Sequence, residues 1–233
     1  MQGIAIDGPA GAGKSTIARH VAHALGFQYI DTGAIYRALT LKAYRSGVSL
    51  DDEEALSTLV NETDLVFKKN DDGFVELYMD GEPVGEDIRT PAIGERVSLL
   101  ARHPRVREAI VKRLKVLAEQ MDVVMDGRDI GTVVMPKAML KIYLTASLEE
   151  RHRRRLLELK QKGLNVNPEQ IKDELIKRDD LDTSRTSGPL KIAQDAVVLD
   201  TTGLNIETVT ETIVQMARER MSRLKVSSSH PPS

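Results

Sequence analysis

The stretch GIAIDGPAGAGKST, residues 3–16, joins a short apolar run to a glycine-rich loop that cannot pack into a core. Residues 8–15 fit the pattern G-x-x-x-x-G-K-[ST], in which the backbone N–H groups of a loop surround an anion. The apolar residues 4–6 predict a buried strand, and residues 14–25 predict a helix whose positive amino end adds to the anion site. The stretch therefore predicts a phosphate-binding loop between a strand and a helix.

Two side chains of this loop are predicted to act on a nucleoside triphosphate. Lys14 is expected to reach the β- and γ-phosphates, and the Ser15 hydroxyl is expected to bind magnesium. The structural alternative is a glycine-rich turn that carries a solvated lysine.

Further short apolar runs alternate with helical patterns along the chain. Non-alternating apolar strands separated by helices indicate an α/β fold, with a parallel sheet that helices cover on both faces. The predicted strands are 123–126, 140–145 and 196–200, with a second strand just before Asp31, and the predicted helices are 32–46, 104–119, 147–161, 168–181 and 205–224.

Residues 62–88 depart from this pattern. Residues 65–67 and 74–79 alternate in hydrophobicity or nearly so, Asp71-Asp72-Gly73 supplies a turn between them, and residues 81–84 add a third short strand. We expect a small antiparallel insert on the parallel core. The whole of residues 1–226 is then one domain, and residues 227–233 (SSSHPPS) form a disordered tail.

Composition excludes several classes of protein. The 233 residues carry a net charge of −2, so no global field attracts nucleic acid, and no segment approaches the roughly 18 apolar residues of a membrane helix. Cysteine is absent, which fits a protein in a reducing compartment but does not prove that location. The start of the chain has no signal-peptide pattern, so we expect a cytoplasmic protein. No coiled-coil heptads occur, so we expect a monomer.

The chemistry expected at the loop is phosphoryl transfer to a small acceptor. The guanine-reading pattern N-K-x-D of GTPases is absent, and an ATPase that drives work is usually larger or repeated. A phosphorylated acceptor brings a second anion, and arginine clamps anions best because its planar guanidinium is bidentate and always charged.

Several arginines follow predicted strands or lie near helix ends. Arg37 lies one helical turn after Gly33, and Asp126, Arg128 and Asp129 follow the strand 123–126, where ligands bind in such sheets. A surface arginine, a turn-capping aspartate and a local ion pair are the structural alternatives.

Three other charged groups allow a functional and a structural interpretation. Arg107 opens a helix, and Arg178 and Asp182 are four residues apart, so each could bind ligand or simply face solvent. Residues 151–155 (RHRRR) allow three interpretations. The default is a solvated helix face, and the second is a mobile lid over residues 153–163 that brings arginines to the triphosphate. The third is an RNA-binding segment. The RNA interpretation is weak, because aromatic residues make up only 3% of the chain.

Taken together, these motifs resemble those of the bacterial cytidylate kinases (CMP kinases), in the nucleoside monophosphate kinase group of P-loop NTPase proteins. The resemblance covers about residues 3–220. It rests on IAIDGPAGAGKST, DTGAIYRA, EDIRT, VREA, MDGRDIGT, KIYLTAS-x-EER and KRDDLDTSR in this order.

The resemblance implies transfer of the γ-phosphoryl group of ATP to CMP or dCMP, with magnesium as cofactor, an NMP-binding insert at 62–88 and a helical lid at 153–163. It implies that Gly8, Pro9, Ala10, Gly11, Ala12, Gly13, Lys14, Ser15 and Thr16 bind ATP, and that Arg153 and Arg154 are lid arginines. It assigns the acceptor phosphate to Arg37 and Arg128, and magnesium to Ser15. Asp126, which follows the strand 123–126 and is expected near the loop, is predicted to reach the ion through water. The cytosine is assigned to Thr32, Arg107, Asp129 and Arg185, and the pentose to Ser98, Arg178 and Asp182.

The residues alone leave other functions open. A P-loop kinase for UMP, AMP or a non-nucleotide acceptor would carry the same loop and arginines, and only the resemblance narrows the base. A nucleotide-dependent switch that binds a partner protein is a further alternative.

Overall fold

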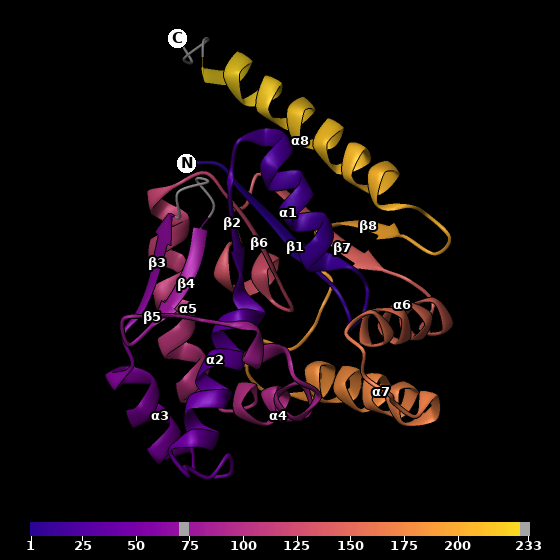
Figure 1. Ribbon diagram of the computed structural model, residues 1–233. Helices are drawn as coiled ribbons and strands as arrows, with labels where there is room; N and C mark the ends of the chain where they lie inside the picture. The colour runs from indigo at the N-terminus through magenta and orange to yellow at the C-terminus, as the bar shows by residue number, and fades with distance from the viewer. Residues whose placement is uncertain (70–74, 229–233) are drawn as a thin grey trace.

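The computed structural model describes residues 1–69 and 75–228, and its centre is a five-stranded parallel sheet (Figure 1). The strand order is β2-β6-β1-β7-β8, so the strand before the glycine-rich loop lies in the middle. The predicted parallel sheet is confirmed. Its strands are β1 (Gly3–Asp7), β2 (Gln28–Asp31), β6 (Val123–Gly127), β7 (Leu140–Thr145) and β8 (Val197–Asp200).

Helices cover both faces of the sheet because side chains of β1 alternate between two apolar clusters. Ile4 and Ile6 pack with α1 (Lys14–Leu25) and α8 (Ile206–Ser228), which lie side by side in Figure 1. Ala5 faces the second cluster, which is built from other helices. These helices are α2 (Thr32–Arg45), α3 (Glu53–Glu62), α4 (Pro91–Ala101) and α5 (Pro104–Gln120).

The predicted insert is present as an antiparallel sheet of β3 (Leu65–Lys69), β4 (Val75–Met79) and β5 (Glu82–Pro83). The turn predicted at residues 71–73 lies outside the described residues. The short helix η1 (Glu86–Arg89) follows β5 and returns the chain to the core through buried Ile88.

Two long helices, α6 (Leu148–Gln161) and α7 (Pro168–Ser184), follow β7. Gly163, at φ 72°, occupies the left-handed region after α6 and lets the chain turn towards α7. Another helical element, η2 (Ile130–Val134), follows β6.

The structure adds two helices to those expected and corrects two boundaries. Helices α3 and α4, which were not predicted, begin after Asp52 and at Pro91. Helix α7 continues past residue 181 to Ser184, because no breaker follows and the last hydroxyls donate back to helix carbonyls. Helix α8 runs to Ser228, two residues into the predicted tail, and residues 229–233 lie outside the described residues.

Among the described residues, no helix has the length and apolar character that crossing a membrane would require.

Candidate active site

The carboxyl ends of three neighbouring strands bring the predicted site residues together. The register pairs Ile6 of β1 with Asp126 of β6, and Asp126 with Asp31 of β2. The glycine-rich loop, the residues after β6 and the start of α2 therefore share one edge of the sheet. A cavity of about 1000 Å³ opens there.

Most of the residues predicted to bind nucleotide line this cavity. Gly8 and Pro9 are outside its described lining and instead shape the loop. The lining includes Ala10, Gly11, Ala12, Gly13, Lys14, Ser15, Thr16, Thr32, Arg37, Ser98, Arg107, Asp126, Arg128, Asp129, Arg153, Arg154, Arg178, Asp182 and Arg185.

The loop is held open by glycine conformations and by its own lysine. Gly11 and Gly13 have φ of 75° and 86°, which side chains other than glycine rarely adopt. At Gly8 a Cβ atom would lie 2.0 Å from the Leu144 carbonyl oxygen, so the loop leaves β1 in close contact with β7. Buried Lys14 donates from Nζ to the Pro9 carbonyl at 2.7 Å, which curls its side chain over the loop.

Four cationic side chains are crowded in the middle of the cavity. Burial, and then the nearby Arg128, lower the pKa of Lys14 well below its usual range. Burial, with Arg128 and Arg37 beside it, lowers the pKa of Arg178 to about 9. Burial, together with Arg89 and Arg128, also lowers the pKa of Arg37. A bound anion would relieve this repulsion, so the cluster favours a polyanionic ligand.

Arg178 has a second feature that favours a ligand in the cavity. Its Nε is buried and has no hydrogen-bond partner among the described residues. A buried guanidinium N–H without an acceptor is costly, and a ligand oxygen in the cavity would satisfy it.

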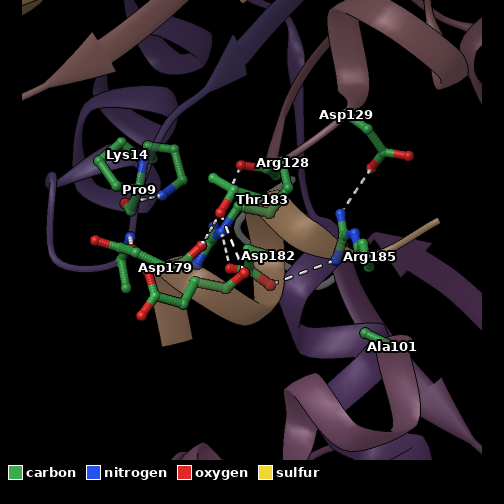
Figure 2. Close-up of polar contacts among 12 residues, drawn as sticks. Pro9, Lys14, Ala101, Arg128, Asp129, Asp179, Asp182, Thr183 and Arg185 are labelled. Carbon is green, nitrogen blue, oxygen red and sulfur yellow. Dashed lines mark hydrogen bonds and ion pairs between the residues drawn. The ribbon is translucent and has the colours of Figure 1, made fainter. Parts of the chain in front are cut away.

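Buried ion pairs form the end of the cavity where the acceptor is predicted to bind, called the acceptor end below (Figure 2). The Arg107 guanidinium, from the first turn of α5, donates to Asp129, and both side chains are almost fully buried, at 3% and 8% exposed. Arg185 approaches the other oxygen of Asp129 at 3.8 Å and donates from Nε to the Gly188 carbonyl at 2.7 Å. The arrangement fixes hydrogen-bonding groups in a buried pocket, as recognition of a planar polar ring requires.

Arg128 and Asp182 form a second buried pair between this end and the loop. Arg128 donates from Nε to Asp182 Oδ2 at 2.6 Å, and Arg185 Nη1 lies 3.4 Å from Asp182 Oδ1. Asp182 lies on α7 rather than in the loop after it, one turn beyond Arg178.

Asp126 is a buried carboxylate beside the loop. Tyr29 donates to its Oδ1 at 2.9 Å, and burial, with the neighbouring Asp31 as the second cause, raises the pKa of Asp126 to about 7. Carboxylate and hydroxyl oxygens suit magnesium, which keeps several waters and phosphate ligands. Ser15 and Asp126 supply oxygen atoms of this kind beside the loop, and the described residues contain no group of three or more His, Cys, Asp or Glu side chains that could hold a metal ion.

The predicted lid arginines differ in position. Arg154 donates from Nη1 to the Thr201 hydroxyl at 3.0 Å and towards the Ala12 carbonyl at 3.4 Å, so it reaches the loop. The side chain of Arg153 lies at the rim, 64% exposed, and its Nε and Nη2 both donate to the Glu150 carboxylate. The strands of the predicted NMP-binding insert contribute no residue to the described lining, whereas Glu86 and Arg89 of η1 do.

Sequence reasoning missed several residues of the site. Arg89 pairs with Asp31 at 3.2 Å, and the motif EDIRT that contains it was the available signal. Thr32 donates its hydroxyl to the Asp126 carbonyl at 2.6 Å, a structural contact in addition to its predicted role. Tyr36 and Arg155 line the cavity too and lie in the motifs DTGAIYRA and RHRRR, but neither was assigned a role. Other lining residues carried no motif of their own: Arg19, His20, Gly94, Val97, Leu204 and Asn205.

Comparison with known proteins adds independent information. The sequence profile of a protein family described as "Cytidylate kinase" matches residues 4–219. A cytidylate kinase of Caldanaerobacter subterraneus subsp. tengcongensis is 51% identical over 216 residues, 93% of this chain and 94% of the relative. A cytidylate kinase of Geobacillus kaustophilus is 49% identical over 218 residues, 94% of this chain and 97% of the relative.

A solved structure resembles the fold. The crystal structure of an uncharacterised protein from Eubacterium ventriosum aligns with a TM-score of 0.53, covering 94% of this chain and 99% of that chain. Sequence identity is 10%, so the likeness concerns the fold alone.

Proposed function

This chain belongs to the cytidylate kinase family, and we propose that it transfers the γ-phosphoryl group of ATP to CMP or dCMP, giving ADP and CDP or dCDP. One observation carries the proposal: a single cavity joins the phosphate-binding loop to a second, buried set of arginines and aspartates. Two anionic ligands can therefore meet across the Lys14–Arg128 region.

The residues align and neutralise the reactants rather than exchange protons with them. The acceptor phosphate is already an anionic nucleophile, so a general base is unnecessary. Arg37 and Arg128 would hold that phosphate in line with the γ-phosphorus of ATP. Lys14 and Arg154 would stabilise the charge that develops on the transferred group and on the departing β-phosphate.

At the acceptor end, Arg107, Asp129 and Arg185 would bind the cytosine ring, and Ser98, Arg178 and Asp182 would face the pentose. The cytosine has both a donor and acceptors on its edge, and the buried Arg107–Asp129 pair offers both kinds of partner. The unpartnered N–H of Arg178 supports its contact with a ligand oxygen.

Magnesium would be held by Ser15 and, through water, by Asp126. When bound, the ion would supply positive charge that offsets the negative charge of the ATP phosphates. The net charge of −2 supports small nucleotides over nucleic acid as partners. A monomeric state and a cytoplasmic location stay predictions from the sequence.

The proposal is tested by release of ADP from magnesium-ATP with one acceptor at a time. We expect fast release with CMP and dCMP, with CDP or dCDP detected, and slow release with UMP, AMP, GMP, shikimate or no acceptor. Equal slow release with every acceptor would contradict the assignment and favour a nucleotide-dependent switch. Fast release with UMP, AMP or shikimate in preference to CMP would favour another P-loop kinase.

Replacement of Arg37 by lysine is expected to weaken CMP binding. A lysine keeps the positive charge but loses the bidentate guanidinium, so the KM for CMP should rise by roughly 10- to 100-fold while the KM for ATP changes little. Steady-state kinetics with both substrates varied would check this. Arg45→Lys on the same helix is the matched control, because Arg45 is exposed; equal effects of the two substitutions would count against the role of Arg37.

Removal of divalent cations by a chelator is expected to abolish ADP release, because the phosphate charges then lose their main counter-charge. Added magnesium should restore it. Full activity in excess chelator, confirmed by metal analysis of the protein, would exclude the proposed role of Ser15 and Asp126.

A further inference from the structure

Helix α7 contacts both the phosphate-binding loop and the acceptor end of the cavity. Arg178 and Asp182 line the acceptor side, whereas Asp179, the residue after Arg178, faces the loop. Its Oδ1 accepts a hydrogen bond from the Ala10 backbone N–H at 3.0 Å. Figure 2 shows Asp179 beside Pro9 of the loop, while Asp182 of the same helix reaches Arg128.

Arg151 of α6 completes this contact. Its Nη1 donates to Asp179 Oδ2 at 2.5 Å and to the Ala10 carbonyl at 2.9 Å, and its Nε donates to the Ala146 carbonyl at 3.2 Å. Both backbone polar groups of Ala10 are therefore fixed by side chains from two other helices. At Gly11 a Cβ atom would lie 3.2 Å from the Arg151 carbonyl oxygen, so the loop also packs directly against α6.

Neither Asp179 nor Arg151 belongs to the described lining of the cavity, although Ala10 between them does. Arg151 is buried, at 8% exposed, and Asp179 is half-buried. A buried ion pair is a poor source of stability, because desolvation offsets much of its attraction. Its hydrogen bonds fix one geometry of the loop instead, which points to a role in positioning.

We propose that Asp179 and Arg151 are positioning residues that couple the phosphate-binding loop to the acceptor site through α7. Asp179 and Arg151 hold Ala10 in the geometry that receives the phosphates of the donor, and an acceptor that contacts Arg178 and Asp182 would stabilise α7 and, with it, this contact. This inference rests on the proposed function, because α7 responds to an acceptor only if the acceptor binds there. Coupling of this kind is reciprocal, so each nucleotide strengthens the binding of the other.

Isothermal titration calorimetry tests the coupling. ADP affinity is measured with and without saturating CMP, for the wild type, Asp179→Asn, Arg151→Lys and the control Asp180→Asn, which alters an exposed neighbour on the same helix. In the wild type and in the control, CMP should strengthen ADP binding by roughly tenfold. In Asp179→Asn and Arg151→Lys this factor should fall close to one, with the affinity for CMP alone nearly unchanged.

Kinetics give a second readout that a merely structural role would not move. Misplacement of the loop should lower kcat of Asp179→Asn by roughly 10- to 100-fold while the KM for CMP stays near the wild-type value. The lysine of Arg151→Lys keeps the charge but cannot hold Asp179 and Ala10 together, so it should reproduce the effect. It also carries the test if Asp179→Asn fails to fold.

The proposal is overturned if the wild type shows no coupling, or if both variants keep the wild-type coupling factor and kcat. A general loss of affinity and thermal stability with an unchanged factor would also overturn it, because that is the signature of packing alone. A wild type that binds ADP but not CMP would refute the acceptor assignment itself. Loop positioning is then judged by ADP affinity alone, and equal affinities in Asp179→Asn and Asp180→Asn would refute it.

Discussion

The substitution Lys14→Met is expected to lower kcat by roughly 100- to 1000-fold while the protein stays folded. Lys14 is buried and lines the cavity beside the loop, and its amine is predicted to contact the β- and γ-phosphates of the donor. Loss of that charge removes stabilisation of the transition state without removing the backbone N–H groups of the loop. Steady-state kinetics with saturating ATP and CMP would measure the change.

The stability of this variant separates chemistry from folding. Burial and the nearby Arg128 lower the pKa of Lys14, so its charged form is disfavoured in the folded protein, and an apolar side chain of similar length should not lower the Tm appreciably. Lys177→Met, at an exposed position, is the matched control. A wild-type rate in Lys14→Met would refute the role of Lys14, and a collapse of the Tm would attribute the loss of rate to unfolding.

The second large effect is expected at the buried pair of the acceptor end. Arg107→Met leaves the Asp129 carboxylate buried with Arg185, at 3.8 Å, as its one remaining ion-pair partner among the described residues. We expect a loss of about 3 kcal/mol in the free energy of unfolding, and a rise of roughly 100-fold in the Kd of CMP. Chemical denaturation and calorimetry would measure the two changes.

The double variant Arg107→Met/Asp129→Asn distinguishes the two consequences. Removal of the stranded charge should recover part of the lost stability, because the buried carboxylate no longer needs a partner. CMP affinity should stay low, because neither the donor nor the acceptor pattern is restored. Recovery of CMP affinity together with stability would contradict direct recognition of the base by this pair.

The central fold could be predicted because each of its signals is local. The pattern at residues 8–15 is typical of a phosphate-binding loop between a strand and a helix, and it predicted β1 before it and α1 after it. The insert could be predicted because β3 and β4 alternate in hydrophobicity while the core strands do not. Boundaries were correct where a glycine or proline marks them, as at Gly26 and Pro104.

One of the two helices that sequence reasoning missed, α4, forms part of the wall of the site. Helix α4 carries Ser98 into the cavity, but its apolar residues follow no clear start signal other than Pro91. Contacts between segments that are distant in the sequence could not be predicted either. The link from Ala10 to Asp179 spans 169 residues, and nothing in the local sequence of either residue announces it.

The arginines also divide into those that local sequence could identify and those that it could not. Proximity to strand ends identified Arg128 and, through the following helix, Arg37, whereas Arg151 and Arg154 cannot be separated by sequence alone. Helical geometry separates them, because Arg151 turns inward to Ala10 and Arg154 reaches Thr201. Arg153 turns to solvent and pairs with Glu150. Tertiary packing therefore decides which of these arginines holds the loop and which can contact a ligand.

The most direct test of the account follows the phosphoryl group itself. The protein is incubated with magnesium and ATP labelled at the γ-phosphate, with and without CMP, and the labelled products are separated. If donor and acceptor meet in one cavity as proposed, the label appears in the β-phosphate of CDP, and little inorganic phosphate forms. Label released as inorganic phosphate at the same rate with and without CMP would contradict direct transfer.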